Sequence, residues 1–324
     1  MPRSAASKIV QLATDEFASD VEYYLALNPR QLPSRYLYDA LGSALFEAIC
    51  ALPWYRVTRA ELALIGVHAR EILADAAPLS RIVELGSGSG EKLAALVAGG
   101  RVSPAAIDVH LIDVSASALD QASRAIGALD DVRVVAHETT YEAGLEEIRL
   151  APADGRTLLL FLGSNLGNFD PPGADEFLRA IRAALAPGDL LLIGADLVKP
   201  ERELLLAYDD PLGVTAAFNR NLLVRINDAL GGDFDLDRFA HRAVWNAEAS
   251  RVEMHLVSRG RQRVRVPGAA LDFTMEDGET IWTESSYKYE PHRLVATLAS
   301  AGFTLVRQWI HDRDRFALTL MKAV

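Results

Sequence analysis

A short apolar segment that runs straight into a glycine-rich turn constrains this fold more than any other feature of the sequence. Arg81–Leu85 has the pattern of a buried strand, residues 86–90 are GSGSG, and Glu91–Val97 has the pattern of a helix. A second apolar strand follows at Ile107–Ile112 and ends at Asp113. This order predicts a parallel βαβ unit, and ligands bind such sheets at the carboxyl ends of the strands. The glycine turn and Asp113 are therefore the first candidate site.

Three alternate glycines, Gly86, Gly88 and Gly90, let the turn approach a ligand closely. A dinucleotide site requires G-x-G-x-x-G, but the third glycine comes one residue early and Glu91 stands in its place. S-adenosylmethionine has no phosphate, carries a positive sulfonium, and offers a ribose diol from which the Asp113 carboxylate can accept hydrogen bonds. The pattern favours S-adenosylmethionine; the alternative is a plain tight turn beside a surface aspartate.

Short apolar runs continue to alternate with amphipathic stretches along the chain. Helices are expected at Ser115–Ala128, Pro172–Leu185 and Pro291–Ala301. Strands are expected at five further places: Val132–Ala136, Thr157–Leu162, Asp189–Gly194, Phe303–Ile310 and Phe316–Met321. The pattern predicts an α/β fold, a doubly wound, seven-stranded Rossmann-like sheet whose last strand is antiparallel.

Two regions interrupt this rhythm. Residues 1–60 read as a helical lead-in, and the rhythm changes again after Asp196. There, residues 200–231 read as mostly helical with a break at 209–211, and residues 240–266 alternate polar and apolar side chains as an antiparallel hairpin or meander would. We therefore expect an inserted α+β substrate-binding domain made of residues 1–59 and 196–286. Residues 60–195 and 287–324 would form the cofactor-binding core.

Composition excludes several function classes. The 324 residues carry a net charge of −11, which disfavours binding to a nucleic-acid backbone or an anionic membrane. A single cysteine, Cys50, excludes an internal disulfide and a cysteine-rich zinc site, and the seven histidines lack metal-ligand spacing. The N-terminus has no secretory pattern, and the longest apolar runs are too short to cross a bilayer. We expect a soluble, cytoplasmic monomer with a small-molecule substrate and no metal.

Two loops after later strands add candidate residues. Thr140 and Tyr141 follow the third strand, where an adenine ring would lie, although a turn with a packed tyrosine explains them equally well. Gly163-Ser164-Asn165-Leu166-Gly167-Asn168-Phe169 follows the fourth strand and brings two amides to the same sheet edge. These amides could grip a carboxylate, while one of them could instead cap the next turn.

Several motifs follow one another along the chain: YLYDALGS (36–43), LPWY (52–55), TRAE (58–61), ELGSG (84–88), FLGSNLGN (161–168), DLVK (196–199), AYDDPLGVTAAFNRN (207–221) and TESSYKY (283–289). Together they resemble one family, the S-adenosylmethionine-dependent histidine Nα-methyltransferases of ergothioneine biosynthesis. The resemblance runs in order from about residue 20 to the C-terminus. The last two motifs lie outside the predicted cofactor fold, so the likeness is more specific than a generic methyltransferase pattern.

The resemblance implies roles for individual residues. Cofactor binding falls on Gly86, Gly88, Lys92, Asp113, Thr140, Tyr141 and Gly163. Substrate binding falls on Asn168 and Tyr208 for the α-carboxylate, Glu284 and Ser286 for the imidazole, and Tyr55 and Met254 for the pocket wall, with Tyr38 near the amine. The sequence departs from the family at Thr140-Tyr141, where an Asp-Phe pair is common, and at Arg56, where a second tyrosine often follows Tyr55.

The expected reaction is transfer of methyl groups from S-adenosylmethionine to the α-amino group of L-histidine, giving the trimethylated betaine hercynine. One alternative keeps the cofactor and changes the amino acid to tryptophan or tyrosine. Glu284 disfavours it, because a hydrocarbon ring gives a buried carboxylate no hydrogen-bond partner. A second alternative is a non-catalytic protein that binds S-adenosylmethionine, which the presence of an intact set of substrate residues disfavours.

Overall fold

The computed structural model describes residues 5–100, 106–151 and 153–324. The chain forms two compact units. The large unit consists of Arg56–Pro200 and Ser286–Val324, and the small unit consists of Met1–Tyr55 and Glu201–Ser285. The units thus divide the chain after Tyr55, Pro200 and Ser285, a few residues from the boundaries expected at 59, 195 and 286.

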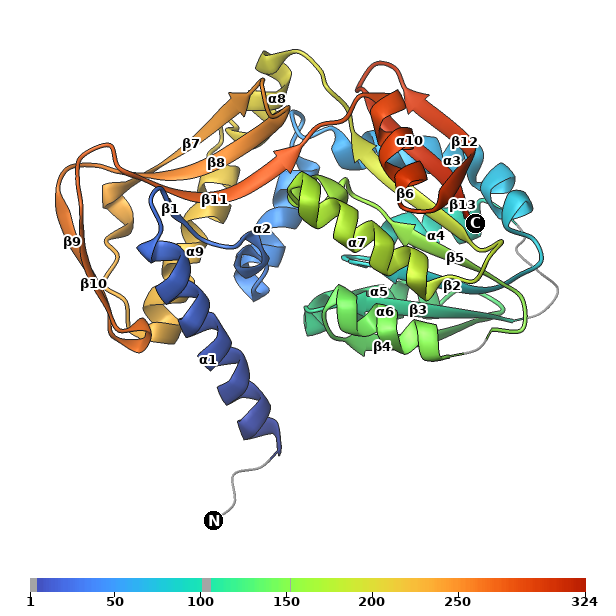
Figure 1. The fold of residues 1–324 in the computed structure, drawn as a ribbon, viewed down its shortest axis with the longest axis horizontal. Helices are drawn as coiled ribbons and strands as arrows, with labels where there is room; N and C mark the ends of the chain where they lie inside the picture. Colours follow the sequence, from blue (N-terminus) through green and yellow to red (C-terminus); the bar gives the residue numbers. More distant parts are fainter. Residues whose placement is uncertain (1–4, 101–105, 152) are drawn as a thin grey trace. The chain divides into compact units, whose positions relative to one another are not determined.

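The large unit is built on a seven-stranded sheet in the order β12-β13-β6-β5-β2-β3-β4 (Figure 1). Its strands are β2 (Leu79–Leu85), β3 (Ile107–Asp113), β4 (Val132–Glu138), β5 (Arg156–Phe161), β6 (Leu190–Asp196), β12 (Phe303–His311) and β13 (Phe316–Ala323). The β2, β3, β4, β5 and β6 strands are parallel, whereas β13 runs antiparallel to both β6 and β12. The predicted doubly wound sheet with an antiparallel last strand is confirmed.

Helices cover both faces of this sheet (Figure 1). They are α3 (Val57–Ala76), α4 (Glu91–Ala98), α5 (Ala116–Gly127), α6 (Tyr141–Leu150), α7 (Pro171–Ala184) and α10 (Pro291–Ser300). Alternate strand residues such as Val83 and Leu85 pack against Leu145 of α6, Phe177 of α7 and Leu294 of α10 in one apolar core. The intervening residues face α3, α4 and α5, which contact one another. Both faces of the inner strands β2, β5 and β6 are therefore buried, which explains their nearly continuous apolar runs, whereas the edge strands β4 and β12 stay largely exposed.

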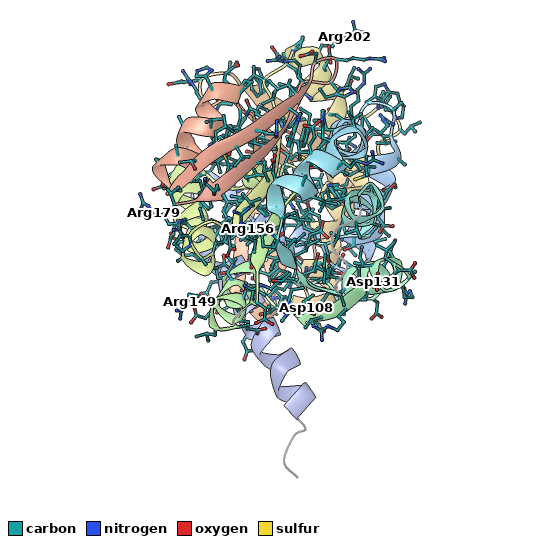
Figure 2. All side chains as sticks on the ribbon, turned by 90° about the vertical axis from the view of Figure 1, so that its right-hand side faces the viewer. Asp108, Asp131, Arg149, Arg156, Arg179 and Arg202 are labelled. Atoms are coloured by element: carbon teal, nitrogen blue, oxygen red, sulfur yellow. The ribbon has the colours of Figure 1, made fainter. Side chains whose placement is uncertain are left out.

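Capping and outer-face charges complete these helices. Ser115 caps α5, its hydroxyl accepting from the Ala118 amide at 3.4 Å. The exposed Arg149 of α6 and Arg179 of α7 project outward (Figure 2), each paired with an acid one turn earlier. Such surface pairs contribute little, so burial of the apolar faces holds these helices.

The small unit combines helices with two small sheets. Its helices are α1 (Ala5–Ala26), α2 (Ala40–Ala51), α8 (Glu201–Tyr208) and α9 (Val214–Leu230), and 3-10 turns span Ser34–Leu37, Leu236–Arg238 and Pro267–Ala269. One sheet has the order β1-β11-β8-β7 and the other pairs β9 with β10. The strands are β1 (Arg30–Gln31), β7 (Phe239–Asn246), β8 (Arg251–Ser258), β9 (Gln262–Val266), β10 (Leu271–Met275) and β11 (Thr280–Tyr287). The last of these continues into the large unit after Ser285.

The antiparallel hairpin or meander expected at residues 240–266 is confirmed as a hairpin, because β7 and β8 form an antiparallel pair. The next strand, β9, does not extend it into a meander and pairs with β10. The elements that were not predicted include the helices α3 and α6 and the strands β1, β10 and β11. The break expected at residues 209–211 separates α8 from α9.

Candidate active site

The glycine turn after β2 has the backbone that its sequence predicts. Gly86 and Gly88 have φ angles of 75° and 49°, a region that side-chain-bearing residues rarely adopt. A Cβ on Gly86 would lie 2.6 Å from the Tyr141 hydroxyl and 3.2 Å from the Asn165 amide nitrogen. Gly86 therefore brings three segments together: the glycine turn, the start of α6 and the loop after β5.

Asp113, the last residue of β3, lies at this turn. One carboxylate oxygen accepts from the Gly88 amide at 3.4 Å, and the other accepts from the Ser115 amide at 2.9 Å. Burial raises the pKa of Asp113 above its ordinary value, and hydrogen bonds from backbone amides oppose the rise. The structure thus brings Asp113 to the glycine turn, as the spacing predicts.

Glu84 is a buried acid that the sequence reasoning did not single out. Its side chain is fully enclosed, and burial raises its pKa to about 8. One of its oxygens has no hydrogen-bond partner among the residues that the structure describes. A buried carboxyl without a partner costs stability, so its place beneath the glycine turn fits a ligand that would supply the missing hydrogen bond.

A buried ion pair joins Lys92 of α4 to Glu61 of α3. The Lys92 ammonium lies 2.7 Å from Glu61, which has no exposed side-chain area. Both Glu61 oxygens also accept from the Gly163 amide, at 3.0 and 2.9 Å. A Cβ on Gly163 would approach the Lys92 ammonium to 3.0 Å. Two residues assigned to the cofactor, Lys92 and Gly163, are therefore held together by a third that sequence reasoning missed.

Thr140 and Tyr141 begin α6. The Thr140 hydroxyl accepts from the Ala143 amide at 3.4 Å and so caps the helix. The Tyr141 ring packs edge-on against Phe161, with ring centroids 5.7 Å apart, and also contacts Phe177. Burial raises the pKa of the Tyr141 hydroxyl well above its ordinary range. The structure therefore shows a helix cap and a packed tyrosine, and the Tyr141 hydroxyl also borders Gly86. Contact of this pair with an adenine ring stays a prediction.

The amide-bearing loop after β5 is tightly constrained. Asn165–Asn168 forms a 3-10 turn that follows two residues with positive φ, Gly163 and Ser164. The Ser164 hydroxyl accepts from the Asp196 amide at 2.9 Å. A Cβ on Gly167 would lie 2.7 Å from the Tyr287 carbonyl oxygen, so the loop packs directly on the end of β11. This packing fixes the position of Asn168 relative to that strand.

Three tyrosines assigned to the substrate gather in the small unit. Tyr55 and Tyr208 have ring centroids 6.3 Å apart. Tyr38 contacts Phe46 at 5.5 Å and Phe218 at 5.6 Å, and Phe46 contacts Tyr55 at 6.1 Å. The structure thus assembles one aromatic cluster from separate segments of sequence. Phe46 and Phe218 were not predicted, although both lie on helices at apolar positions.

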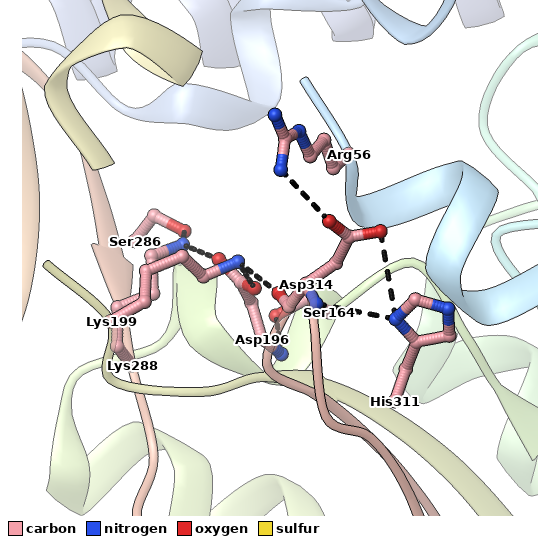
Figure 3. A network of polar contacts seen from close by, with 8 residues as sticks. All are labelled: Arg56, Ser164, Asp196, Lys199, Ser286, Lys288, His311 and Asp314. Carbon is pink, nitrogen blue, oxygen red and sulfur yellow. Dashed lines mark hydrogen bonds and ion pairs between the residues drawn. The ribbon is translucent and has the colours of Figure 1, made fainter. Parts of the chain in front are cut away.

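Met254 and Glu284 lie on neighbouring strands of the same small sheet. Met254 of β8 is buried, and its carbonyl oxygen accepts from the Thr283 hydroxyl at 3.0 Å. Glu284 of β11 has 9% of its area exposed. Ser286 follows two residues later on β11, in the large unit, and its hydroxyl accepts from the Lys288 ammonium at 2.9 Å (Figure 3). Alternation along a strand points Glu284 and Ser286 to the same face.

Two further observations concern the described residues alone. No group of three or more His, Cys, Asp or Glu side chains is arranged there to hold a metal ion. None of the described helices is long and apolar enough to span a membrane.

Comparison with known proteins decides the family. The model for histidine-specific, S-adenosylmethionine-dependent methyltransferases matches residues 17–323. The chain belongs to this family. The methyltransferase is 41% identical over 309 residues to a histidine N-alpha-methyltransferase from Mycolicibacterium smegmatis, covering 95% of each chain. It is 42% identical over 302 residues to the protein of the same name from Mycobacterium tuberculosis, covering 93% of each.

A more distant relative is longer than this methyltransferase. Ergothioneine biosynthesis protein 1 from Neurospora crassa is 29% identical over 302 residues, which cover 88% of this chain and 32% of that protein. The family resemblance recognised in the motifs is therefore confirmed. The glycine turn of the methyltransferase lies in its large unit, beside Asp113 and the buried Glu84.

Proposed function

We propose that this methyltransferase moves methyl groups from S-adenosylmethionine to the α-amino group of L-histidine, giving Nα,Nα,Nα-trimethylhistidine (hercynine) for ergothioneine biosynthesis. The observation that carries the proposal is 41–42% identity to two histidine N-alpha-methyltransferases along nearly the whole chain. The residues that the resemblance assigns to histidine are all present in this sequence.

The large unit would hold the cofactor. Asp113 would accept hydrogen bonds from the ribose diol, and the glycine turn would let the ligand approach the backbone amides. Lys92 and Gly163 would bind at the opposite side of the turn, and Tyr141 would border the adenine ring. Bound S-adenosylmethionine supplies an electrophilic methyl group on a sulfonium.

Histidine would be held at both ends. Asn168 and Tyr208 would bind its carboxylate, and Glu284 and Ser286 would bind its imidazole. Tyr55 and Met254 would line the pocket between these ends. A substrate anchored in this way keeps its amine free to rotate between successive transfers.

Each transfer is an in-line displacement at the methyl carbon, which requires a neutral amine and a short, aligned approach. The amine of a free amino acid is mostly protonated near pH 7, so a proton must leave before the amine attacks. We propose that Tyr38 positions the amine and passes its proton to solvent. Every added methyl removes an N–H, so binding that depends on carboxylate and ring suits all three steps.

A thermal-shift panel of free amino acids, with and without S-adenosylhomocysteine, tests the proposal, because a ligand that binds the native state raises its stability. Histidine should stabilise the protein in the presence of S-adenosylhomocysteine, and mass spectrometry should find the trimethylated product. Stabilisation and methylation by tryptophan or tyrosine instead would support the alternative substrate. Cofactor binding without methylation of any amino acid would support a non-catalytic role.

We also propose a cytoplasmic monomer whose partner is a small molecule. The net charge of −11 supports the small-molecule partner, because it disfavours binding to nucleic acid or anionic lipid. Light scattering coupled to size-exclusion chromatography should give a mass near 35.3 kDa. A mass near twice that value would refute the monomer.

A further inference from the structure

A buried cluster of charges lies against Ser286 in the large unit. Asp196, the last residue of β6, has its carboxylate between two lysines, Lys199 at 2.6 Å and Lys288 at 3.1 Å (Figure 3). The exposed side-chain fractions are 2% for Asp196, 9% for Lys199 and 0% for Lys288. Fully burying an ammonium is costly, so the contacts that Lys288 makes with the Asp196 carboxylate and the Ser286 hydroxyl call for an explanation beyond packing.

The two lysines have different second contacts. Lys199 donates to the Asp314 carbonyl oxygen at 2.7 Å, on the side of the cluster away from the strand β11. Lys288 donates to the Ser286 hydroxyl oxygen at 2.9 Å. Only Lys288 therefore links the Asp196 carboxylate to a residue assigned to the imidazole.

Backbone hydrogen bonds also hold the segment that contains Ser286 and Lys288. The Tyr289 amide donates to the Asp196 carbonyl oxygen at 3.1 Å, and the Val198 amide donates to the Tyr289 carbonyl oxygen at 3.1 Å. The Tyr289 hydroxyl donates to the Leu166 carbonyl oxygen at 3.3 Å. Ser286 thus belongs to a segment tied both to the end of β6 and to the amide loop.

The hydrogen-bond chemistry of Lys288 restricts what Ser286 can do. An ammonium donates and never accepts, so Lys288 occupies a lone pair of the Ser286 oxygen and the hydroxyl hydrogen must point elsewhere. Donation from a charged group also polarises the hydroxyl and makes it a better donor. Ser286 is therefore prepared to donate a hydrogen bond.

We propose that Lys288, held by Asp196, is a positioning residue that makes Ser286 a hydrogen-bond donor to the unprotonated nitrogen of the substrate imidazole. This inference rests on the proposed histidine methylation. Glu284, on the same face of β11, accepts from the ring N–H. Together they select a neutral imidazole in one orientation, and an indole, which has an N–H but no ring acceptor, leaves Ser286 unsatisfied.

A double-mutant cycle between Lys288→Met and Ser286→Ala tests the coupling. Each single variant should lower kcat/KM for histidine by about tenfold, mostly through KM, and the double variant should be no worse than Ser286→Ala alone. Lys199→Met is the matched control, because it removes the other lysine from Asp196 without touching Ser286; it should change kcat/KM by less than about twofold. Lys288→Arg, which retains the charge and the donors, should recover part of the loss.

Two histidine analogues separate positioning from a general structural role. 4-Thiazolylalanine keeps a ring acceptor next to the attachment carbon but has no ring N–H, and 3-pyrrolylalanine has the N–H at the other nitrogen position but no acceptor. Lys288→Met should lower kcat/KM for thiazolylalanine by about tenfold and leave pyrrolylalanine nearly unchanged. Unchanged S-adenosylhomocysteine affinity by calorimetry establishes that each variant is folded.

Several outcomes would overturn the proposal. Losses that multiply in the double variant would show that Lys288 acts independently of Ser286. Equal losses for both analogues would make Lys288 purely structural. If Lys288→Met does not fold, Ser286→Ala can still be tested with the two analogues. A loss of kcat/KM confined to pyrrolylalanine would show that Ser286 accepts a hydrogen bond from the ring, which would overturn the proposal. A wild-type enzyme that does not methylate histidine would instead refute the proposed function, which is a distinct result.

Discussion

Replacing Glu61 by alanine should weaken cofactor binding even though Glu61 is not among the residues assigned to the cofactor. Glu61 accepts twice from the Gly163 amide and pairs with Lys92. It therefore fixes the first residue of the loop after β5 and the direction of the Lys92 side chain. A Cβ on Gly194 would lie 1.8 Å from a Glu61 oxygen, so the strand β6 also packs directly against the carboxylate.

The magnitude follows from the partners that Glu61→Ala leaves behind. The Gly163 amide loses its acceptor in a buried place, which costs about 1–3 kcal/mol. Lys92 keeps 22% of its side chain exposed and can turn to water, so loss of the ion pair adds only about 1 kcal/mol. Together these two losses should destabilise the ligand-binding conformation of the loop after β5 by about 2–4 kcal/mol. This corresponds to a roughly 30- to 700-fold weaker affinity for S-adenosylhomocysteine.

Isothermal titration calorimetry with S-adenosylhomocysteine measures this loss. Glu61→Gln should fall between wild type and Glu61→Ala, because its amide oxygen still accepts from Gly163 but no longer neutralises Lys92. Glu71→Ala is the control on the same helix; its partner is His68 and its affinity should match wild type. A folded Glu61→Ala protein that binds the ligand as tightly as wild type would refute the reasoning.

Four further predictions test the site. Asp113→Ala should weaken S-adenosylhomocysteine by about 1.5–3 kcal/mol in calorimetry and Asp113→Asn by less, because the amide still accepts from the Ser115 N–H; equal affinities would remove Asp113 from the site. Glu284→Ala should lower kcat/KM for histidine by roughly 30- to 1,000-fold and for tryptophan much less, and an unchanged ratio between the two substrates would show that Glu284 does not bind the imidazole. Nα,Nα-dimethylhistidine should be converted to the trimethylated product, and accumulation of monomethylhistidine alone with fresh cofactor would contradict a single site for all transfers. The pKa of Glu84 rises from 4.5 to about 8 on folding, so its contribution to stability is complete below pH 4.5 and is lost as pH rises through 8. The melting temperature of the ligand-free protein should therefore fall more steeply from pH 6 to 9 than that of Glu84→Gln. Parallel curves of melting temperature against pH would refute the assignment.

Local sequence was sufficient for the sheet because its inner strands are buried on both faces and its strands are bounded by clear turns. The helix α6 was missed for a local reason. Its centre carries Gly144, which lowers helix propensity. The structure explains that glycine, since a Cβ there would lie 2.6 Å from the Ile112 side chain. The spacing of Leu145 and Ile148 after the capping Thr140 was the signal that could have identified the helix.

Long-range contacts account for what the sequence could not predict. Glu61 and Gly163 are 102 residues apart, and nothing in either segment indicates that a carboxylate meets an amide. The same holds for Lys288 and Asp196, which belong to different segments of the large unit. The strand β11 was seen only as a family motif, although the buried Ile281 and Thr283 alternate with the half-buried Thr280 and Trp282 as in a strand.

The buried charges of the large unit follow the order of its strands. In the sheet, β6, β5, β2 and β3 are neighbours. Asp196 ends β6, Gly163 with its Glu61 partner follows β5, Glu84 lies one residue before the end of β2, and Asp113 ends β3. Burying polar groups in this way costs stability, and an apolar residue at any of these strand ends would pack without that cost. Their concentration at one edge, where parallel strands present their carboxyl ends, is what a site for a polar ligand requires. The apolar core of the sheet offsets the free-energy cost of burying these polar groups. The glycine turn and Asp113 lie at this same edge, so they indicated a ligand site from the sequence alone.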